Sequence, residues 1–149
     1  MPDYVQKSRE RFGHQAPEQP QHPPHKWNKP VFGKQTPQAP ITNTTVEYLD
    51  EKYTKRIQEI SGTYIYCGRG VDSSILPTLN ERLTQQSAPT TDTTAKTDML
   101  LDYLATHLDA KVRFYATDMH LYLESDAAYL VLPRASSRCA VYYYLGDKL

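Results

Sequence analysis

The chain has 149 residues, enough for one domain with a modest core. Its 17 Lys and Arg residues equal its 17 Asp and Glu residues, so no overall positive field would draw the chain to nucleic acid. No apolar run approaches the roughly 18–20 residues of a membrane helix, and the polar N-terminal stretch is unlike a secretory signal. We therefore expect an intracellular protein, in the cytoplasm or nucleus, that is neither secreted nor bound to a membrane.

The first expected element is a short helix in residues 1–12. Pro2 stands where a proline is tolerated in the first helical turn. One face of this helix would carry Tyr4, Val5, Ser8 and Phe12. Residues 13–46 then lose all periodicity and contain seven of the eleven prolines. This composition predicts a disordered or extended linker with polyproline II character.

The linker carries histidines and basic residues. His14, His22 and His25 form no complete metal-ligand motif, so we expect solvated imidazoles rather than a metal site. Lys26 and Lys29 lie on either side of an aromatic residue, a composition that can follow a phosphate backbone. A solvated basic tail is the other interpretation of these two lysines.

Residues 47–109 are expected to be helical, and the first of three helices begins near Asp50. Asp50 is a candidate N-cap, because a short acidic side chain can accept a hydrogen bond from the first turn. Gly68 and Gly70 would end this helix. Its apolar face is expected to carry Ile57, Ile60, Tyr64 and Ile65.

Two further helices are expected in the same region. Ser73 or Ser74 can cap the second helix. Pro77 then falls in its first turn, where the missing N–H costs little. Thr90 or Thr91 begins the third helix. The expected apolar positions of the two helices are Ile75, Leu76, Leu79 and Leu83, then Met99, Leu100, Tyr103, Leu104 and Leu108.

Residues 110–149 read as strands, which makes the chain an α+β protein. Met119, Leu121 and Leu123 alternate with polar residues, the pattern of a strand with one buried face. The expected strands are 111–115, 119–126 and 138–145.

Asp126, near the end of the second expected strand, is the strongest candidate for chemistry. Glu124 precedes it by two residues and would project from the same face. Two carboxylates at this spacing can be metal ligands or can simply form the solvated face of a strand, and the sequence alone favours the solvated face. The sequence shows no phosphate-binding glycine loop, no nucleophile elbow and no polymerase signature.

Arg134 and Arg138 flank a pair of serines between the last two expected strands. They could contact a nucleic-acid backbone, and they could equally keep the hairpin in solution. Three consecutive tyrosines in the last strand are expected to pack rather than to stack on bases. They are Tyr142, Tyr143 and Tyr144.

Several short stretches follow one another in an informative order. They are Met1-Pro2-Asp3-Tyr4-Val5 with Arg11-Phe12, Arg56-Ile57-Gln58 with Ser61-Gly62-Thr63-Tyr64-Ile65-Tyr66, Gly70-Val71-Asp72, Leu101-Asp102-Tyr103-Leu104-Ala105-Thr106-His107, Glu124-Ser125-Asp126-Ala127-Ala128-Tyr129, Ser137-Arg138 and Tyr144-Leu145-Gly146-Asp147. In this order and spacing they resemble the polyprotein of copia-type retrotransposons, where reverse transcriptase joins ribonuclease H. The stretch Gly68-Arg69-Gly70 departs from the family's usual Ala-Arg-Ala, and Val141 stands where the family commonly has Gly.

The resemblance implies a fold and a site. Residues 1–12 would end the reverse transcriptase region, and 13–46 would be the family's variable linker. Residues 47–109 would be a helical connection segment, and 110–149 an incomplete antiparallel ribonuclease H-like β unit. Asp126 would be the first metal-binding acid of ribonuclease H, whereas Glu124 matches no catalytic position. The parent enzyme would use Mg²⁺ and bind an RNA–DNA hybrid or DNA.

The chain stops at Leu149, before the other acids of ribonuclease H. We therefore expect a truncated fragment that needs no cofactor, binds nucleic acid weakly at best and lacks polymerase and nuclease activity alone. We also expect self-association through the exposed edge of the last strand. The alternatives are a non-catalytic module that binds nucleic acid or a protein, and an unrelated α+β protein without a catalytic role.

Overall fold

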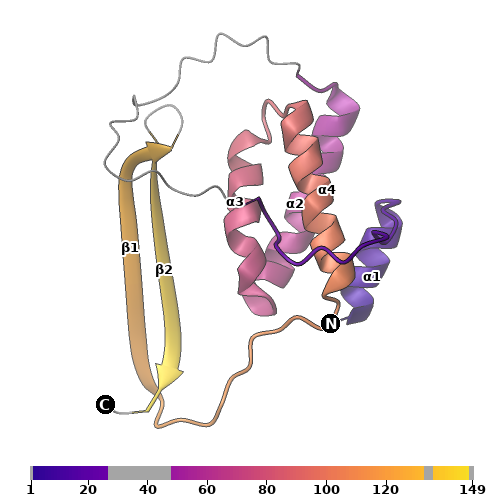
Figure 1. Cartoon of the computed structure of the whole chain (residues 1–149). Coiled ribbons are helices and arrows are strands. Elements are labelled where there is room, and N and C mark those ends of the chain that lie inside the picture. The colour runs from indigo at the N-terminus through magenta and orange to yellow at the C-terminus, as the bar shows by residue number, and fades with distance from the viewer. Residues whose placement is uncertain (1, 27–47, 133–135, 148–149) are drawn as a thin grey trace. The chain divides into compact units, whose positions relative to one another are not determined.

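The chain forms two compact units, which are considered separately. The computed structural model describes residues 2–26, 48–132 and 136–147. A helical unit comprises residues 2–26 and 48–112, and a hairpin unit comprises residues 113–132 and 136–147. Four helices precede a two-stranded antiparallel sheet, so the predicted α+β composition is confirmed (Figure 1). None of the described helices is both long and apolar enough to cross a membrane.

Helix α1, Pro2–Arg11, forms where the sequence predicts it. Val5 and Ser8 are buried on one face, as is Phe12 directly after the helix. The Tyr4 hydroxyl donates to the carbonyl oxygen of Thr63 at 2.8 Å, which ties this face to the next helix. The predicted packing face of α1 is therefore confirmed.

Helix α2, Glu51–Gly70, begins and ends at the predicted residues. The Asp50 carboxylate accepts from the backbone N–H of Tyr53 at 3.0 Å and caps the helix. Gly68 lies where α2 meets α3, because a Cβ built on it would lie 2.8 Å from Leu76 Cδ2 and 3.2 Å from Ile75 Cγ1. The absence of a side chain at Gly68 allows this close approach.

Helix α3, Leu76–Gln85, follows a short 3₁₀ turn η1, Ser73–Ile75. The prediction that a serine caps α3 is wrong. Asp72 caps η1, accepting from the Ser74 N–H at 3.1 Å and from the Ser74 hydroxyl at 2.6 Å. Ile75 occupies the N-cap position of α3 and has no polar side chain, so α3 starts without a side-chain cap, with Pro77 in its first turn.

Helix α4, Thr91–Thr106, begins after a capping box. The Thr90 hydroxyl accepts from the Thr93 N–H, and the Thr93 hydroxyl accepts from the Thr90 N–H. The predicted start at Thr90 or Thr91 is confirmed: Thr90 is the N-cap and Thr91 the first helical residue. Helix α2 packs against η1 and α3, and α4 packs against α1 and α3. The core between them consists mainly of Val5, Phe12, Ile60, Tyr64, Cys67, Ile75, Leu79, Leu100, Leu101, Tyr103 and Leu104.

Arg82 on α3 is the largest fully buried side chain, with only 1% of its surface exposed. Its Nη2 lies 3.3 Å from Glu81 Oε1, yet none of its three guanidinium nitrogens has a hydrogen-bond partner among the described residues. Burial lowers the pKa of Arg82, and the neighbouring Glu81 carboxylate opposes this shift. Burial of this charged group without hydrogen bonds to described residues therefore lowers the free energy of unfolding.

Replacing Arg82 with methionine is expected to raise the free energy of unfolding by about 1–3 kcal/mol. Methionine keeps most of the aliphatic stem and removes the desolvated charge. Urea denaturation followed by far-ultraviolet circular dichroism measures the change, with Arg69→Met at an exposed position as the control. A clear loss of stability would show that the guanidinium has partners beyond those described.

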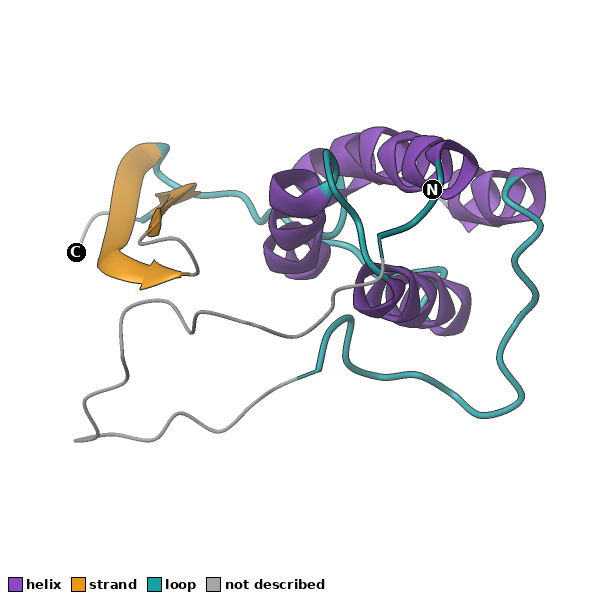
Figure 2. Cartoon of the chain, turned by 90° about the horizontal axis from the view of Figure 1, so that it is seen from above, coloured by secondary structure: helices purple, strands orange, loops and turns teal. Residues whose placement is uncertain are grey.

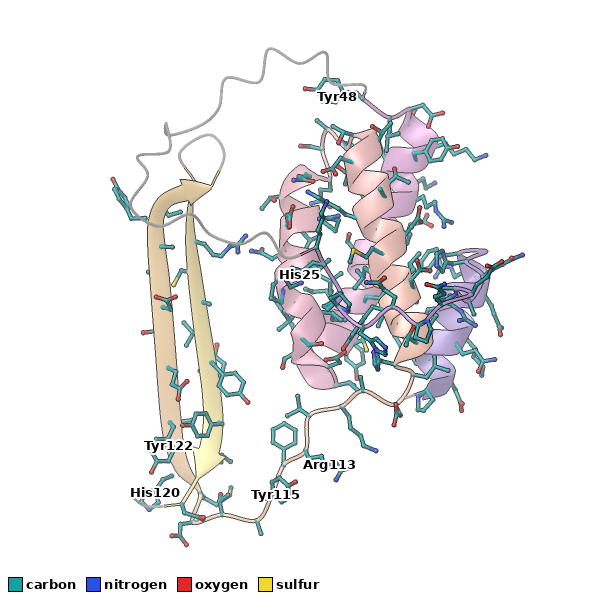
Figure 3. The ribbon with its side chains drawn as sticks, in the orientation of Figure 1. His25, Tyr48, Arg113, Tyr115, His120 and Tyr122 are labelled. Atoms are coloured by element: carbon teal, nitrogen blue, oxygen red, sulfur yellow. The ribbon has the colours of Figure 1, made fainter. Side chains whose placement is uncertain are left out.

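The described part of the linker is held against the helical unit by hydrogen bonds. Residues 14–26 have no helix or strand, as expected, and form a loop in Figure 2, but several of them form hydrogen bonds with the helices. Thr106 Oγ1 accepts from the Gln21 N–H at 2.9 Å, and Thr78 Oγ1 donates to the Pro24 carbonyl. His25, labelled in Figure 3, lies near the end of this described stretch. Linker residues 27–46 lie outside the described residues.

The prediction of solvated histidines is wrong for His14. Its Nε2 lies 2.7 Å from Asp102 Oδ1 on α4, and its side chain is 13% exposed. His22 is exposed, as expected, with its Nδ1 3.2 Å from Nε2 of His107. The carboxylate of Asp102 is far away in sequence, so spacing within the linker could not show the pairing.

The hairpin consists of β1, His120–Leu132, and β2, Ser136–Gly146. The two pair antiparallel from His120 opposite Gly146 to Ala128 opposite Arg138, with an irregularity before Leu132. The predicted strand over 111–115 is wrong. Val112 instead donates its N–H to the Val71 carbonyl at 2.6 Å, and 111–115 has no strand partner among the described residues.

Candidate functional site

The register of the hairpin gives it two chemically different faces. Residues directly opposite each other share a face, and so do residues two apart along one strand. One face carries tyrosines and acids: Tyr122, Glu124, Asp126, Tyr142 and Tyr144. The other carries no charged residue among its paired positions from 121 to 145: Leu121, Leu123, Ser125, Ala127, Cys139, Val141, Tyr143 and Leu145.

Stacked tyrosines organise the first face. The rings of Tyr122 and Tyr144 stack across the two strands, with centroids 5.3 Å apart and planes 15° apart (Figure 3). Tyr142 lies 5.5 Å from Tyr144 on the same strand. The Tyr144 hydroxyl donates to Glu124 Oε1 at 3.2 Å, which raises the pKa of Tyr144. The rings of Tyr142 and Tyr144 thus contact each other, but Tyr142 and Tyr143 are 50% and 64% exposed, so the predicted packing role of the three tyrosines is not confirmed.

Asp126 lies in the middle of β1, opposite Ala140 of β2. Its side chain is exposed, and Glu124 shares its face, as the alternation predicts. Among the described residues, no group of three histidine, cysteine or acidic side chains converges as a metal site would require. The described hairpin therefore presents one or two carboxylates and does not by itself fit a Mg²⁺ pair, which needs several.

Among the described basic candidates, Arg138 belongs to the same unit as Asp126. Arg138 is exposed on β2 opposite Ala128, on the same face as Asp126 but one pair further along. Lys26 is exposed in the other unit. Lys29 and Arg134 lie outside the described residues.

The uncharged face of the hairpin corrects one expectation. The alternation predicts a half-buried strand, yet Leu121 and Leu123 are 64% and 62% exposed. Across the strands, Tyr143 is 64% exposed and Val141 45%. Alternation shows which face a residue takes, and it carries no information on whether another layer covers that face.

Replacing Tyr143 with lysine is expected to reduce self-association of the chain. The uncharged face and the adjoining β2 edge offer apolar side chains and backbone groups to another copy, and a lysine there would have to be desolvated. Analytical ultracentrifugation over a concentration series measures the change. Tyr142→Lys, on the opposite face of the same strand, is the matched control and should have a smaller effect. A monodisperse parent chain at high concentration would contradict this prediction.

A buried polar network joins three elements that the sequence did not connect. Asp72 is buried after α2, and its Oδ2 accepts from the Tyr103 hydroxyl of α4 at 3.2 Å. The Ser74 hydroxyl lies 2.9 Å from the same tyrosine oxygen. Burial raises the pKa of the Cys67 thiol, and the Asp72 carboxylate adds to this shift, so the buried thiol is unreactive.

No signal in the sequence indicated the contact between Asp72 and Tyr103, because the two residues are 31 positions apart. Comparison of the chain with protein-family models, with curated proteins and with solved structures finds no match. The family resemblance therefore rests on the order and spacing of the sequence motifs.

Proposed function

We propose that this chain is part of a copia-type retrotransposon polyprotein, from the region in which the reverse transcriptase connection leads into ribonuclease H. In the parent enzyme, this region would help to hold the RNA–DNA hybrid of template and primer. It would also supply one carboxylate, Asp126, to the Mg²⁺ ions that perform hybrid cleavage.

The observation that best supports the proposal is the position of the Ser125-Asp126-Ala127 stretch. It lies inside β1, with its aspartate opposite β2, and the hairpin follows a helical unit in the chain. A ribonuclease H-type site requires this placement, because a strand holds its first carboxylate in a fixed direction. The described helices and strands follow the element order that the resemblance implies for residues 47–109 and 110–149.

Alone, the chain is expected to be inactive as a polymerase and as a nuclease. Hybrid cleavage by two metal ions needs several carboxylates to hold the ions about 4 Å apart and to orient the attacking water. The described hairpin offers Asp126 and Glu124, and the hydroxyl of Tyr144 already binds Glu124. Lys26 and Arg138 would add weak, salt-sensitive contacts to phosphates.

An assay of RNA–DNA hybrid cleavage tests this proposal. With Mg²⁺ or Mn²⁺ present, we expect the purified chain to cleave no more hybrid than its Asp126→Asn variant does. A complete ribonuclease H in the same buffer shows that the substrate and ions are competent. Cleavage that disappears in Asp126→Asn and persists in Asp109→Asn, an exposed acid of the helical unit, would show that the chain is an active nuclease.

A further inference from the structure

The helical unit contains a pocket that the proposed function does not use. It has a volume of about 540 Å³ and lies where the end of α1 meets α2 and the first half of α4. Its lining consists of Arg11, Phe12, Lys52, Tyr53, Arg56, Glu59, Thr94 and Asp98. Lys52, Arg56 and Glu59 recur at helical spacing and share one face of α2. Thr94 and Asp98, four residues apart, share one face of α4.

Charge is concentrated in this pocket. Three cationic and two anionic side chains line it, for a net charge of +1. None of the ion pairs formed among the described residues involves any of these five side chains. Arg11, Lys52 and Glu59 are exposed, so they form the rim. Charged groups that face a pocket without pairing one another remain available to a ligand.

The deeper residues are polar and held in place. Arg56 donates through Nη1 to the Phe12 carbonyl, which fixes its guanidinium and leaves its other N–H groups available. Thr94 Oγ1 is buried and has no hydrogen-bond partner among the described residues. Because this oxygen exposes almost no surface, a ligand in the pocket cannot reach it as the side chain stands, so Arg56 and Asp98 supply the deeper polar groups.

The remaining wall is aromatic. Tyr53 is 48% exposed, so one side of its ring remains open to a planar ligand. Phe12 is buried beneath Arg11, whose guanidinium carbon lies 5.5 Å from the ring centroid. Aromatic rings of this kind stack on planar heterocycles.

We propose that this pocket binds a nucleoside phosphate, with the phosphate at Arg11 and Lys52, the base against Tyr53 and the base edge at Asp98. The excess positive charge at the rim selects an anionic group. The carboxylate selects a ring that bears hydrogen-bond donors. This inference goes beyond the proposed function and does not depend on the family.

The carboxylate predicts which base is preferred. Guanine presents two neighbouring donors, N1–H and N2–H₂, which a carboxylate can accept together. Adenine presents one donor beside an acceptor on the same edge, so it would leave a carboxylate oxygen facing a lone pair. Guanosine monophosphate should therefore bind more tightly than adenosine monophosphate, and inorganic phosphate should bind most weakly.

Isothermal titration calorimetry of the full chain at low ionic strength tests the proposal. We expect guanosine monophosphate to bind with a dissociation constant below about 1 mM. Lys52→Gln and Asp98→Asn should each weaken binding by about tenfold. Lys55→Gln, an exposed lysine of α2 outside the pocket lining, is the matched control and should leave binding unchanged.

Two further variants separate lost binding from lost folding. Burial raises the pKa of Asp98, so its ionised form is disfavoured in the folded state, and Asp98→Asn should not lower stability at neutral pH. Glu59→Gln removes a rim carboxylate that repels phosphate, so it should tighten binding, which unfolding cannot do. The origin of the ligand is tested by competition. If a single-stranded oligonucleotide with a 5′-phosphoguanosine end displaces guanosine monophosphate from the pocket, the ligand is the end of a nucleic-acid strand. If the oligonucleotide does not compete, the ligand is a free nucleotide.

Three outcomes would overturn the proposal. They are no saturable binding of guanosine monophosphate at millimolar concentration, equally tight binding of inorganic phosphate, and equal losses in Lys55→Gln and Lys52→Gln. None of these outcomes bears on hybrid cleavage by Asp126, so failure here would leave the family proposal standing.

Discussion

Replacing Leu100 with alanine is expected to lower the free energy of unfolding by about 2–5 kcal/mol, enough to unfold much of the helical unit. Leu100 is fully buried on α4, in the core shared by the four helices. Helix α4 packs against both α1 and α3, so a cavity at this position removes contacts to more than one neighbour. Side chains around a fully packed site move little to fill a cavity, so the loss of stability should lie in the upper part of this range, at about 4–5 kcal/mol.

Thermal and urea denaturation followed by helical circular dichroism measures this loss. Leu121→Ala on the hairpin is the matched control, because the same side chain is 64% exposed there. Its expected effect is within about 0.5 kcal/mol. Similar losses from the two substitutions would contradict the position of the core between the helices.

Replacing Asp72 with alanine is expected to cost about 3 kcal/mol. The substitution removes the cap of η1 and leaves the buried Tyr103 hydroxyl without its carboxylate acceptor. It also removes the carboxylate acceptor of the Ser74 N–H and hydroxyl, although the hydroxyl keeps its contact with Tyr103. These contacts tie the end of α2 to α4 through one side chain.

A double-mutant cycle isolates the long-range part of this network. Tyr103→Phe removes the partner hydroxyl, so the loss caused by Asp72→Ala should be smaller by about 1 kcal/mol in that background. Asp109→Ala, at an exposed position, is the control and should change stability little. Strictly additive losses from Asp72→Ala and Tyr103→Phe would show that the two side chains do not interact.

The helix boundaries could be predicted because the signals are local. Asp50 and Thr90 accept from N–H groups three residues ahead, so the sequence contains both partners of each cap. The cap of η1 is also local, yet sequence reasoning chose a serine because serine and aspartate are both good caps. Only the folded chain shows that Asp72 also binds Tyr103, 31 residues away.

The hairpin shows where local patterns stop being informative. Alternation correctly assigned Leu121 and Glu124 to opposite faces of β1. It gave no information on how exposed the uncharged face is, because exposure is a property of tertiary packing. The segment 111–115 has strand-like composition, but a strand exists only with a partner, and Val112 bonds to Val71 instead.

Of the two candidate sites, the sequence indicated Asp126 on the hairpin but not the pocket of the helical unit. The position of Asp126 on a paired strand was predicted because its motif is contiguous. The pocket of the helical unit was not predicted, because Arg11, Arg56 and Asp98 come from three helices and belong to no short motif. The pairing of His14 with Asp102 was missed for the same reason.

The most direct test of the central claim is the sequence of the DNA on both sides of the coding segment. The proposal of a copia-type polyprotein predicts a Tyr-x-Asp-Asp polymerase palm, intact or decayed, encoded upstream. It also predicts the remaining ribonuclease H carboxylates encoded downstream, in the same orientation. Flanking DNA on both sides that encodes neither would contradict the proposal.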